Sequence, residues 1–172
     1  MKIEELEFEG LYGISLNPYV DERGTLIRIW DSLSELSTFD LIQASHVTNQ
    51  HKGTLRGIHF QDGHGSETKV VQCVAGKVFD VIVDLRPHTV TFNKVFSVYL
   101  GENSAFGGLV IPAGCAHGYI TLEPNSELIY FMDNLYSPEL TRGIRWNDPR
   151  YSINWPIDPI LISDQDSNWP LQ

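Results

Sequence analysis

Short apolar runs separated by turn residues dominate the middle of this 172-residue chain. Between residues 68 and 134, β-branched and aromatic side chains gather in runs of about 5 to 8 residues, and Gly, Pro, Asn or Asp separates the runs. They read TKVVQCVAG, KVFDVIVDLRP, NKVFSVYLGEN, GGLVIPAG, CAHGYITLEPN and SELIYFMDN. Such spacing is typical of antiparallel strands in a sandwich or barrel, the double-sheet jelly roll included. The sequence therefore predicts an all-β fold.

Regular structure is sparse elsewhere in the sequence. DSLSELSTF at residues 31–39 favours one short helix, and the segment from Tyr136 onward, rich in Pro, Asp and Trp, favours surface loops. No internal repeat, low-complexity segment or linker interrupts the chain. We therefore expect a single domain over residues 1–172, a length that suits one compact domain.

The net charge of the chain limits the kinds of molecule it can bind. A formal net charge of −10 argues against nucleic acid as a partner, because sequence-independent binding needs a basic face that displaces counterions. Within so acidic a chain, a local cluster of arginines instead suggests a specific small anion.

The sequence lacks the patterns that direct a protein to a membrane or out of the cell. No apolar stretch approaches the roughly 20 residues that span a bilayer, and the acidic N-terminus MKIEELEFEG lacks the pattern of a signal peptide. Cys73 and Cys115 lack CxxC spacing, which fits reduced structural thiols. We expect a cytoplasmic protein with no membrane partner.

The stretch GTLRGIHFQ places Arg56 and His59 in a strand that otherwise favours burial. Side chains three positions apart point to opposite faces of a regular strand. A bulge or twist near Gly57 is therefore needed if both are to serve one site.

A second stretch, IPAGCAHGYIT, resembles the second motif of the cupin jelly rolls through Pro112, Gly114 and His117. Gly53, His59 and Gly76 fall in register with the first cupin motif, but Gln61 replaces its second histidine, and Lys69 stands where a glutamate ligand is expected. An ammonium group among the ligands repels a divalent cation. We therefore expect a cupin-type jelly roll with short peripheral helices and with neither a metal nor another cofactor.

The alternative of a metal-dependent cupin, for example an oxygenase, would combine His59 and His117 with His64 and Glu67. We expect HGSE, which holds the last two, to be an exposed turn.

The full set of motifs resembles the dTDP-4-dehydrorhamnose 3,5-epimerase family. In chain order they are VDERG, TLRGIHFQ, ETKVVQCVAGKVFDVIVDLR, IPAGCAHGYITLE, LIYFMDNLYSPE, RGIRWNDP, INWP and ISDQD. The resemblance implies an isomerase that inverts C3, C5 or both in a nucleotide-diphosphate-linked 4-keto-6-deoxy sugar through an enolate. It also implies a homodimer that exchanges N-terminal strands, which would cover exposed sheet edges.

The resemblance assigns four catalytic residues. His59 matches the base, a role suited to an imidazole, whose ordinary pKa of about 6.5 lies near working pH. Asp166 matches its carboxylate partner, with Asp164 as a rival in the same loop. Tyr130 matches the acid that returns a proton, and Lys69 would stabilise the enolate oxygen.

The resemblance also implies substrate contacts. Arg56 and Arg23 would hold the diphosphate, for which the fork of a guanidinium suits better than an ammonium. Tyr136 matches an aromatic that stacks near the nucleotide base or sugar. Asn49, Gln61 and His117 are second-rank candidates for contacts with sugar, phosphate or enolate.

We expect the other charged residues and histidines to have structural roles or no role in the site. Asp80 and Asp84 are expected to pair with arginines such as Arg86. The remaining histidines, which we expect to be exposed and without function, are His46, His51, His64 and His88.

The chain departs from the family pattern after D-x-R-G, where Thr25, Leu26, Ile27 and Arg28 replace an aromatic pair and a glutamate. Those positions lie near the nucleotide base in the family. Arg28 cannot accept the N–H of thymine or uracil but can donate to cytosine N3 or to phosphate. The sequence therefore does not decide which nucleotide base the substrate carries. His46 and Thr141 also depart from the pattern. The sequence therefore decides neither which sugar is the substrate nor whether C3, C5 or both are inverted.

Two further functions remain as alternatives. One is a noncatalytic jelly roll that binds a sugar nucleotide, and the other is a ketoisomerase on the same fold.

Overall fold

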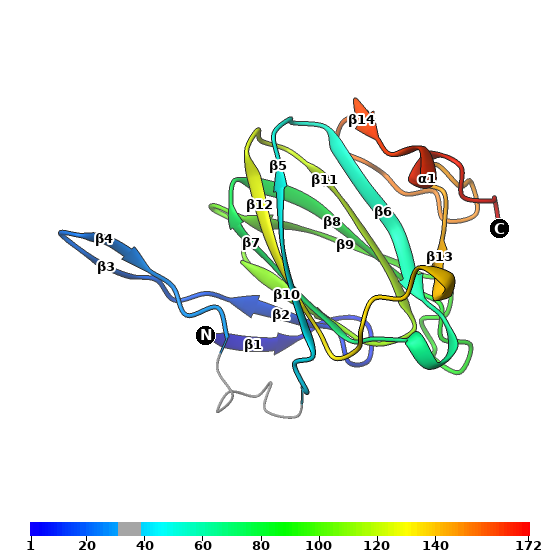
Figure 1. Cartoon of the computed structure of the whole chain (residues 1–172), viewed down its shortest axis with the longest axis horizontal. Helices are drawn as coiled ribbons and strands as arrows, with labels where there is room; N and C mark the ends of the chain where they lie inside the picture. Colours follow the sequence, from blue (N-terminus) through cyan, green and yellow to red (C-terminus); the bar gives the residue numbers. More distant parts are fainter. Residues whose placement is uncertain (31–38) are drawn as a thin grey trace.

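The computed structural model describes residues 1–30 and 39–172, which form two large β-sheets and a two-stranded hairpin (Figure 1). The first sheet has the order β1 (Lys2–Glu5), β2 (Tyr12–Ser15), β10 (Gly108–Ile111), β7 (Lys69–Ala75), β12 (Ser126–Met132) and β5 (Gln43–Asn49). The second has the order β13 (Thr141–Gly143), β6 (Thr54–Gln61), β11 (Cys115–Thr121), β8 (Lys77–Asp84) and β9 (Val95–Gly101).

The remaining elements are short. β14 (Leu161–Ile162) pairs in parallel with β6, and β3 (Tyr19–Asp21) with β4 (Gly24–Leu26) forms the hairpin, which extends away from the sandwich (Figure 1). The helical pieces are η1 (Gly63–Gly65), η2 (Pro138–Leu140) and α1 (Asp164–Ser167). None of these described helices has the length and hydropathy that crossing a bilayer requires.

The predicted all-β jelly-roll class with short peripheral helices is confirmed. All six predicted runs form strands, β7 to β12. The strands β1 to β5 were not predicted, and the helix expected at 31–39 falls almost entirely outside the described residues. The segment after Tyr136 is mainly irregular, as expected, apart from the short elements η2, β13, β14 and α1.

Both faces of the second sheet are covered by apolar side chains. β8 shows this best, since Val78 and Ile82 face the core between the sheets while Val81 and Val83 face an outer cluster. The C-terminal segment covers that outer cluster with aliphatic and aromatic residues, among them Ile144, Trp146, Tyr151 and Trp155. A strand buried on both faces has a nearly continuous apolar sequence, as KVFDVIVD of β8 shows.

β6 contains the irregularity that was expected near Gly57. His59 pairs with His117 of β11, whereas Arg56 pairs with Tyr119, so β6 holds one extra residue between the two pairs. Gly57 has a φ of +105°, its peptide bond to Ile58 is cis, and its N–H donates to Asp166 Oδ2 at 3.0 Å. The extra residue redirects the side chains that follow it, and the predicted bulge is confirmed.

We predict that Gly57→Ala destabilises the protein by at least about 2 kcal/mol, since a left-handed backbone and an overpacked contact each cost about 1–2 kcal/mol or more. The added Cβ would lie 2.6 Å from His117 O and 2.7 Å from Gly118 Cα. Urea unfolding followed by tryptophan fluorescence measures the loss. Gly63→Ala is the control, because Gly63 also has a positive φ (+58°), but the Cβ that alanine adds there would meet no atom within 4 Å. Equal losses for the two variants would contradict the prediction.

Candidate active site

A cavity of about 600 Å³ lies between the sheets, next to β6. Side chains of β6 and β11 line one side, side chains of β7 and β12 line the other, and β14 and α1 close one end. As far as the described residues define it, eight of the eleven predicted site residues line this cavity: His59, Tyr130, Asp166, Lys69, Arg56, Gln61, His117 and Tyr136. The bulge at Gly57 thus lets Arg56 and His59 share one site.

The imidazole of His59 is kept neutral by its surroundings. Burial and the nearby charge of Lys69 lower the pKa of His59 to about 4, and the carboxylate of Asp166 opposes this shift. At neutral pH the ring is therefore unprotonated and able to accept a proton.

Asp166 reaches the cavity from α1. Its Oδ2 accepts a hydrogen bond from Gly57 N, its Oδ1 accepts one from Trp169 Nε1 at 3.3 Å, and its own N–H donates to Ser163 Oγ at 3.0 Å. Within the described residues no hydrogen bond joins Asp166 to the His59 ring, so its influence on His59 is electrostatic. Asp164, the rival, is exposed and lies outside the set of described cavity-lining residues.

Tyr130 faces the cavity from the opposite sheet. Burial, followed by the neighbouring Tyr119, raises the pKa of Tyr130 well above its ordinary value of 10.0. Its ring centroid lies 6.2 Å from that of His117, in an edge-to-face arrangement. The phenol is therefore protonated at neutral pH and able to donate.

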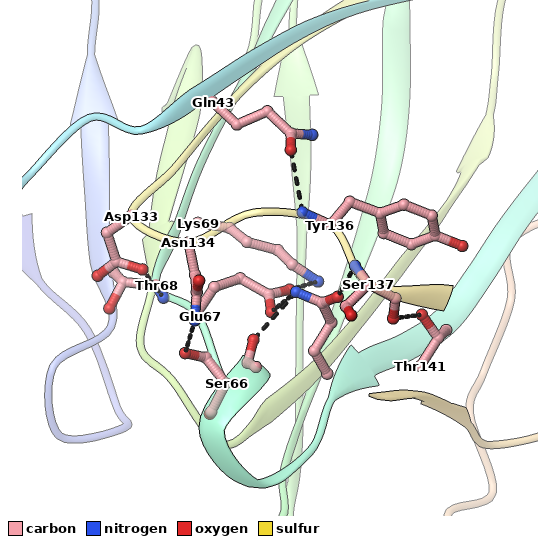
Figure 2. Close-up of polar contacts among 12 residues, drawn as sticks. Gln43, Ser66, Glu67, Thr68, Lys69, Asp133, Asn134, Tyr136, Ser137 and Thr141 are labelled. Carbon is pink, nitrogen blue, oxygen red and sulfur yellow. Dashed lines mark hydrogen bonds and ion pairs between the residues drawn. The ribbon is translucent and has the colours of Figure 1, made fainter. Parts of the chain in front are cut away.

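Lys69 begins β7 and brings a cation into the same cavity. Its Nζ lies 2.9 Å from Glu67 Oε1, and the two side chains point toward one another (Figure 2). The expectation that HGSE is an exposed turn holds for His64, but it is wrong for Glu67, which is buried and lines the cavity.

Arg56 is held at the cavity by a hydrogen bond to the buried side chain of Asn49. Its Nε donates to Asn49 Oδ1 at 2.9 Å, and the hydroxyl of Tyr119 donates to the same oxygen at 3.3 Å. Asn49 itself is buried and, among the described contacts, does not line the cavity. Its geometry suits orienting Arg56 better than contacting a ligand.

His117 forms a buried pair with Asp80. His117 Nε2 lies 2.9 Å from Asp80 Oδ2, and burial raises the pKa of Asp80 while His117 opposes the shift. The expected pairing of Asp80 with an arginine is wrong, whereas Asp84 does pair with Arg86 at 2.8 Å. Strand alternation puts Asp80 on the core-facing side of β8 with Val78 and Ile82, where its partner His117 comes from the neighbouring strand β11.

Gln61 and Tyr136 meet at the rim of the cavity. Gln61 is buried and donates to Glu67 Oε2 at 2.7 Å and to Leu135 O at 3.1 Å, while its Oε1 accepts from Ser137 N. The N–H of the exposed Tyr136 donates to Gln43 Oε1 at 3.0 Å (Figure 2). Gln61 thus holds the backbone on both sides of Tyr136.

Arg23 and Arg28 lie apart from the other predicted residues. Arg23 belongs to the β3–β4 hairpin, where it pairs with Asp21 at 2.6 Å and keeps 83% of its side chain exposed. Arg28 follows β4 and is exposed. Neither is among the described residues that line the cavity of their own chain.

The cavity combines three groups suited to moving a proton beside a carbonyl group. His59 is a neutral acceptor, Tyr130 a protonated donor, and Lys69 a cation that can stabilise negative charge on oxygen. Because His59 comes from one sheet and the other two from the facing sheet, a ligand between the sheets can touch all three. Among the described residues, no group of three His, Cys, Asp or Glu side chains is arranged to hold a metal ion.

Comparisons with known proteins identify relatives along nearly the whole chain. A model of the family dTDP-4-dehydrorhamnose 3,5-epimerase matches residues 5–172. The curated dTDP-4-dehydrorhamnose 3,5-epimerase of Escherichia coli K12 is 36% identical over 174 residues, which cover 96% of this chain and 91% of the relative. A crystal structure of dTDP-4-dehydrorhamnose 3,5-epimerase from Bacillus anthracis with TDP and PPi bound has a TM-score of 0.92 at 31% identity, over 99% of each chain. A 3'-monoepimerase from Streptomyces bikiniensis in complex with dTDP-quinovose has a TM-score of 0.87 at 28% identity, over 97% of this chain and 86% of that one.

We predict that the His59 ring titrates with a pKa of about 4, and that two neighbouring variants shift it in opposite directions. Lys69→Met removes a repelling cation and raises the pKa of His59, whereas Asp166→Asn removes an attracting anion and lowers it. Asparagine keeps an oxygen that can accept from Gly57 N, and the second variant loses only the hydrogen bond from Trp169 Nε1, which would face an NH₂ group. NMR titration of the histidine ring signals measures all three values. A pKa of His59 near the ordinary value of about 6.5 would contradict the prediction.

Proposed function

The chain belongs to the dTDP-4-dehydrorhamnose 3,5-epimerase family, and we propose that it epimerises a dTDP-linked 4-keto-6-deoxy sugar at C3, C5 or both. Family membership confirms the resemblance found in the sequence, and the family consists of isomerases, so the chain is assigned to that enzyme class. The observation that carries the proposal is the shared cavity of His59, Tyr130 and Lys69, which brings together the groups that such an epimerisation requires.

The proposed reaction proceeds through an enolate. The neutral ring of His59 takes a proton from the carbon beside the ketone, and the electrons of that C–H bond move to the ketone oxygen. The charge of Lys69 stabilises this oxygen, and the hydroxyl of Tyr130 delivers a proton to the opposite face of the carbon. Asp166 would stabilise the imidazolium that forms on His59, consistent with its effect on the pKa of that ring.

The diphosphate of the substrate would bind to Arg56, which lines the cavity and is oriented by Asn49. Tyr136, at the rim, is suited to stacking against the sugar or the nucleotide base. The names of the relatives favour thymine as that base. Cytosine stays an alternative on account of Arg28.

A homodimer is also part of the proposal. Tyr19, Val20 and Leu26 on the β3–β4 hairpin are 64 to 68% exposed, and apolar residues exposed to this degree suit a protein interface. If the hairpin packs against a second copy, Arg23 at its turn can reach the partner's cavity and contact the diphosphate there. The cytoplasmic location expected from the sequence stays a prediction.

We predict that the enzyme in D₂O incorporates deuterium at C3 or C5 of a dTDP-linked 4-keto-6-deoxy hexose, as detected by NMR and mass spectrometry. His59→Asn should lower kcat by about 10² to 10⁴, the usual contribution of a positioned base. Tyr130→Phe should retain exchange but lose inversion, because proton removal does not need the phenol. His88→Asn, at an exposed histidine, is the matched control.

The same assay separates the alternatives. The position of the label shows which centre reacts, and a dTDP, CDP, UDP and GDP series of substrates identifies the base. Migration of the ketone to C3 would identify a ketoisomerase. Binding without exchange for every substrate in the series would indicate a noncatalytic protein and overturn the proposal.

We predict that Arg23 acts on the cavity of the partner. In that arrangement, a mixed dimer of a His59→Asn chain and an Arg23→Ala chain contains one site with both residues intact. Co-expression of the two variants should therefore give more activity at low substrate concentration than either variant alone. Activity equal to the average of the two separate variants, or a monomer in light-scattering measurements, would contradict the prediction.

A further inference from the structure

Glu67 is a buried carboxylate in the cavity to which the proposed reaction gives no task. Only 4% of its side chain is exposed, against 12% for Lys69, its ion-pair partner. A charge so far from water is costly unless it is paired and hydrogen-bonded. The position of Glu67 beside the one lysine of the described cavity lining therefore calls for a functional explanation.

Both carboxylate oxygens of Glu67 are committed to protein groups. Oε1 lies 2.9 Å from Lys69 Nζ, and Oε2 accepts from Gln61 Nε2 at 2.7 Å. Gln61 is itself fixed, since its two N–H donors are shared among Glu67 Oε2, Gly65 O at 3.0 Å and Leu135 O, and its Oε1 accepts from Ser137 N. Glu67 is thus a rigid anchor, with one oxygen held by a fixed amide and the other directed at the ammonium.

Lysine needs such an anchor to act as a precise electrostatic group. Its four-carbon chain is flexible, and its ammonium is a compact charge with three donors. One donor directed at Glu67 fixes the position of Nζ and leaves the others for the cavity. Stabilisation of a developing oxyanion depends on donors that are already in place before charge appears.

We propose that Glu67 is a positioning residue, which holds the ammonium of Lys69 at the place where the enolate oxygen of the substrate forms. The inference rests on the proposed function, because it assumes an enolate in this cavity. Glu67 acts through Lys69 and does not touch the reacting atoms.

The variant Glu67→Gln tests the role with little change of shape. If its amide oxygen keeps the contact with Lys69, its NH₂ group faces Gln61 Nε2, and two donors then oppose each other. If the amide is reversed, the NH₂ group faces the ammonium. Either orientation loses one of the two contacts, whereas Gln61 keeps its bonds to Leu135 O and Ser137 N, on the two sides of Tyr136.

Kinetics of the full-length enzyme with the dTDP-linked 4-ketosugar should show a fall in kcat of about tenfold to a hundredfold in Glu67→Gln. This is the range expected when a group is displaced by about 1 Å. KM should change little, because Lys69 acts mainly on the transition state. Glu4→Gln, which removes an exposed carboxylate 3.5 Å from Lys2, is the matched control and should leave kcat unchanged.

A double-mutant cycle distinguishes positioning from a general structural effect. In a Lys69→Met background, Glu67→Gln should have almost no further effect on kcat, because its only route of action is gone. Thermal unfolding of every variant verifies the folded fraction. If Glu67→Gln does not fold, Glu67→Asp keeps the buried charge but shortens its reach, and it should show the same fall in kcat and the same dependence on Lys69.

Each outcome supports or overturns the inference. An unchanged kcat, or effects of Glu67 and Lys69 that multiply independently, would overturn it while leaving the proposed function intact. Wild-type enzyme that exchanges no deuterium with any of the ketosugars would overturn the proposed function, and the role of Glu67 with it.

Discussion

The hydrogen bond from Gly57 N to Asp166 Oδ2 connects the two parts of the chain on which the cavity depends. On one side is the bulge in β6, which lets Arg56 and His59 face the same space despite their spacing. On the other is α1, a four-residue helix that the C-terminal segment brings against β6. Only a backbone without a Cβ fits there, since Gly57 lies close to His117 O and Gly118 Cα. The contact therefore fixes both the base and the carboxylate that influences it.

The charges in the cavity have to be understood together. The charge of Lys69 and burial lower the pKa of His59, which keeps the ring neutral, and the same charge is available to an anion that forms in the cavity. Asp166 limits the lowering, so that the ring retains some affinity for a proton. Glu67 balances the charge of Lys69 through their ion pair. The cation that forms when His59 takes a proton can coexist with the ammonium of Lys69, because Asp166 offsets the first charge and Glu67 the second.

The sequence predicted the fold best where a strand carries an unbroken run of β-branched and aromatic residues. β7 to β12 have long β-branched runs, whereas β1 and β3 are short and mostly exposed, so their sequences carry little pattern. The bulge followed from the spacing of Arg56 and His59 together with the resemblance, which assigns both to one site. Glu67 was misjudged because HGSE has the local composition of a turn, while its burial results from contacts with Gln61 and Lys69. Asp80 was misjudged because its partner, His117, lies 37 positions away, and distant pairings of this kind cannot be read from local pattern.

The C-terminal segment covers the outer face of the second sheet and then delivers Asp166 to the cavity. During synthesis these residues leave the ribosome after β1 to β12, so most strands of both sheets are already available. Until then, the nascent chain exposes an apolar sheet face and holds His59 without its carboxylate. One segment thus supplies both the cover of the sheet and Asp166, and a chain cut short before Ile144 would lack both.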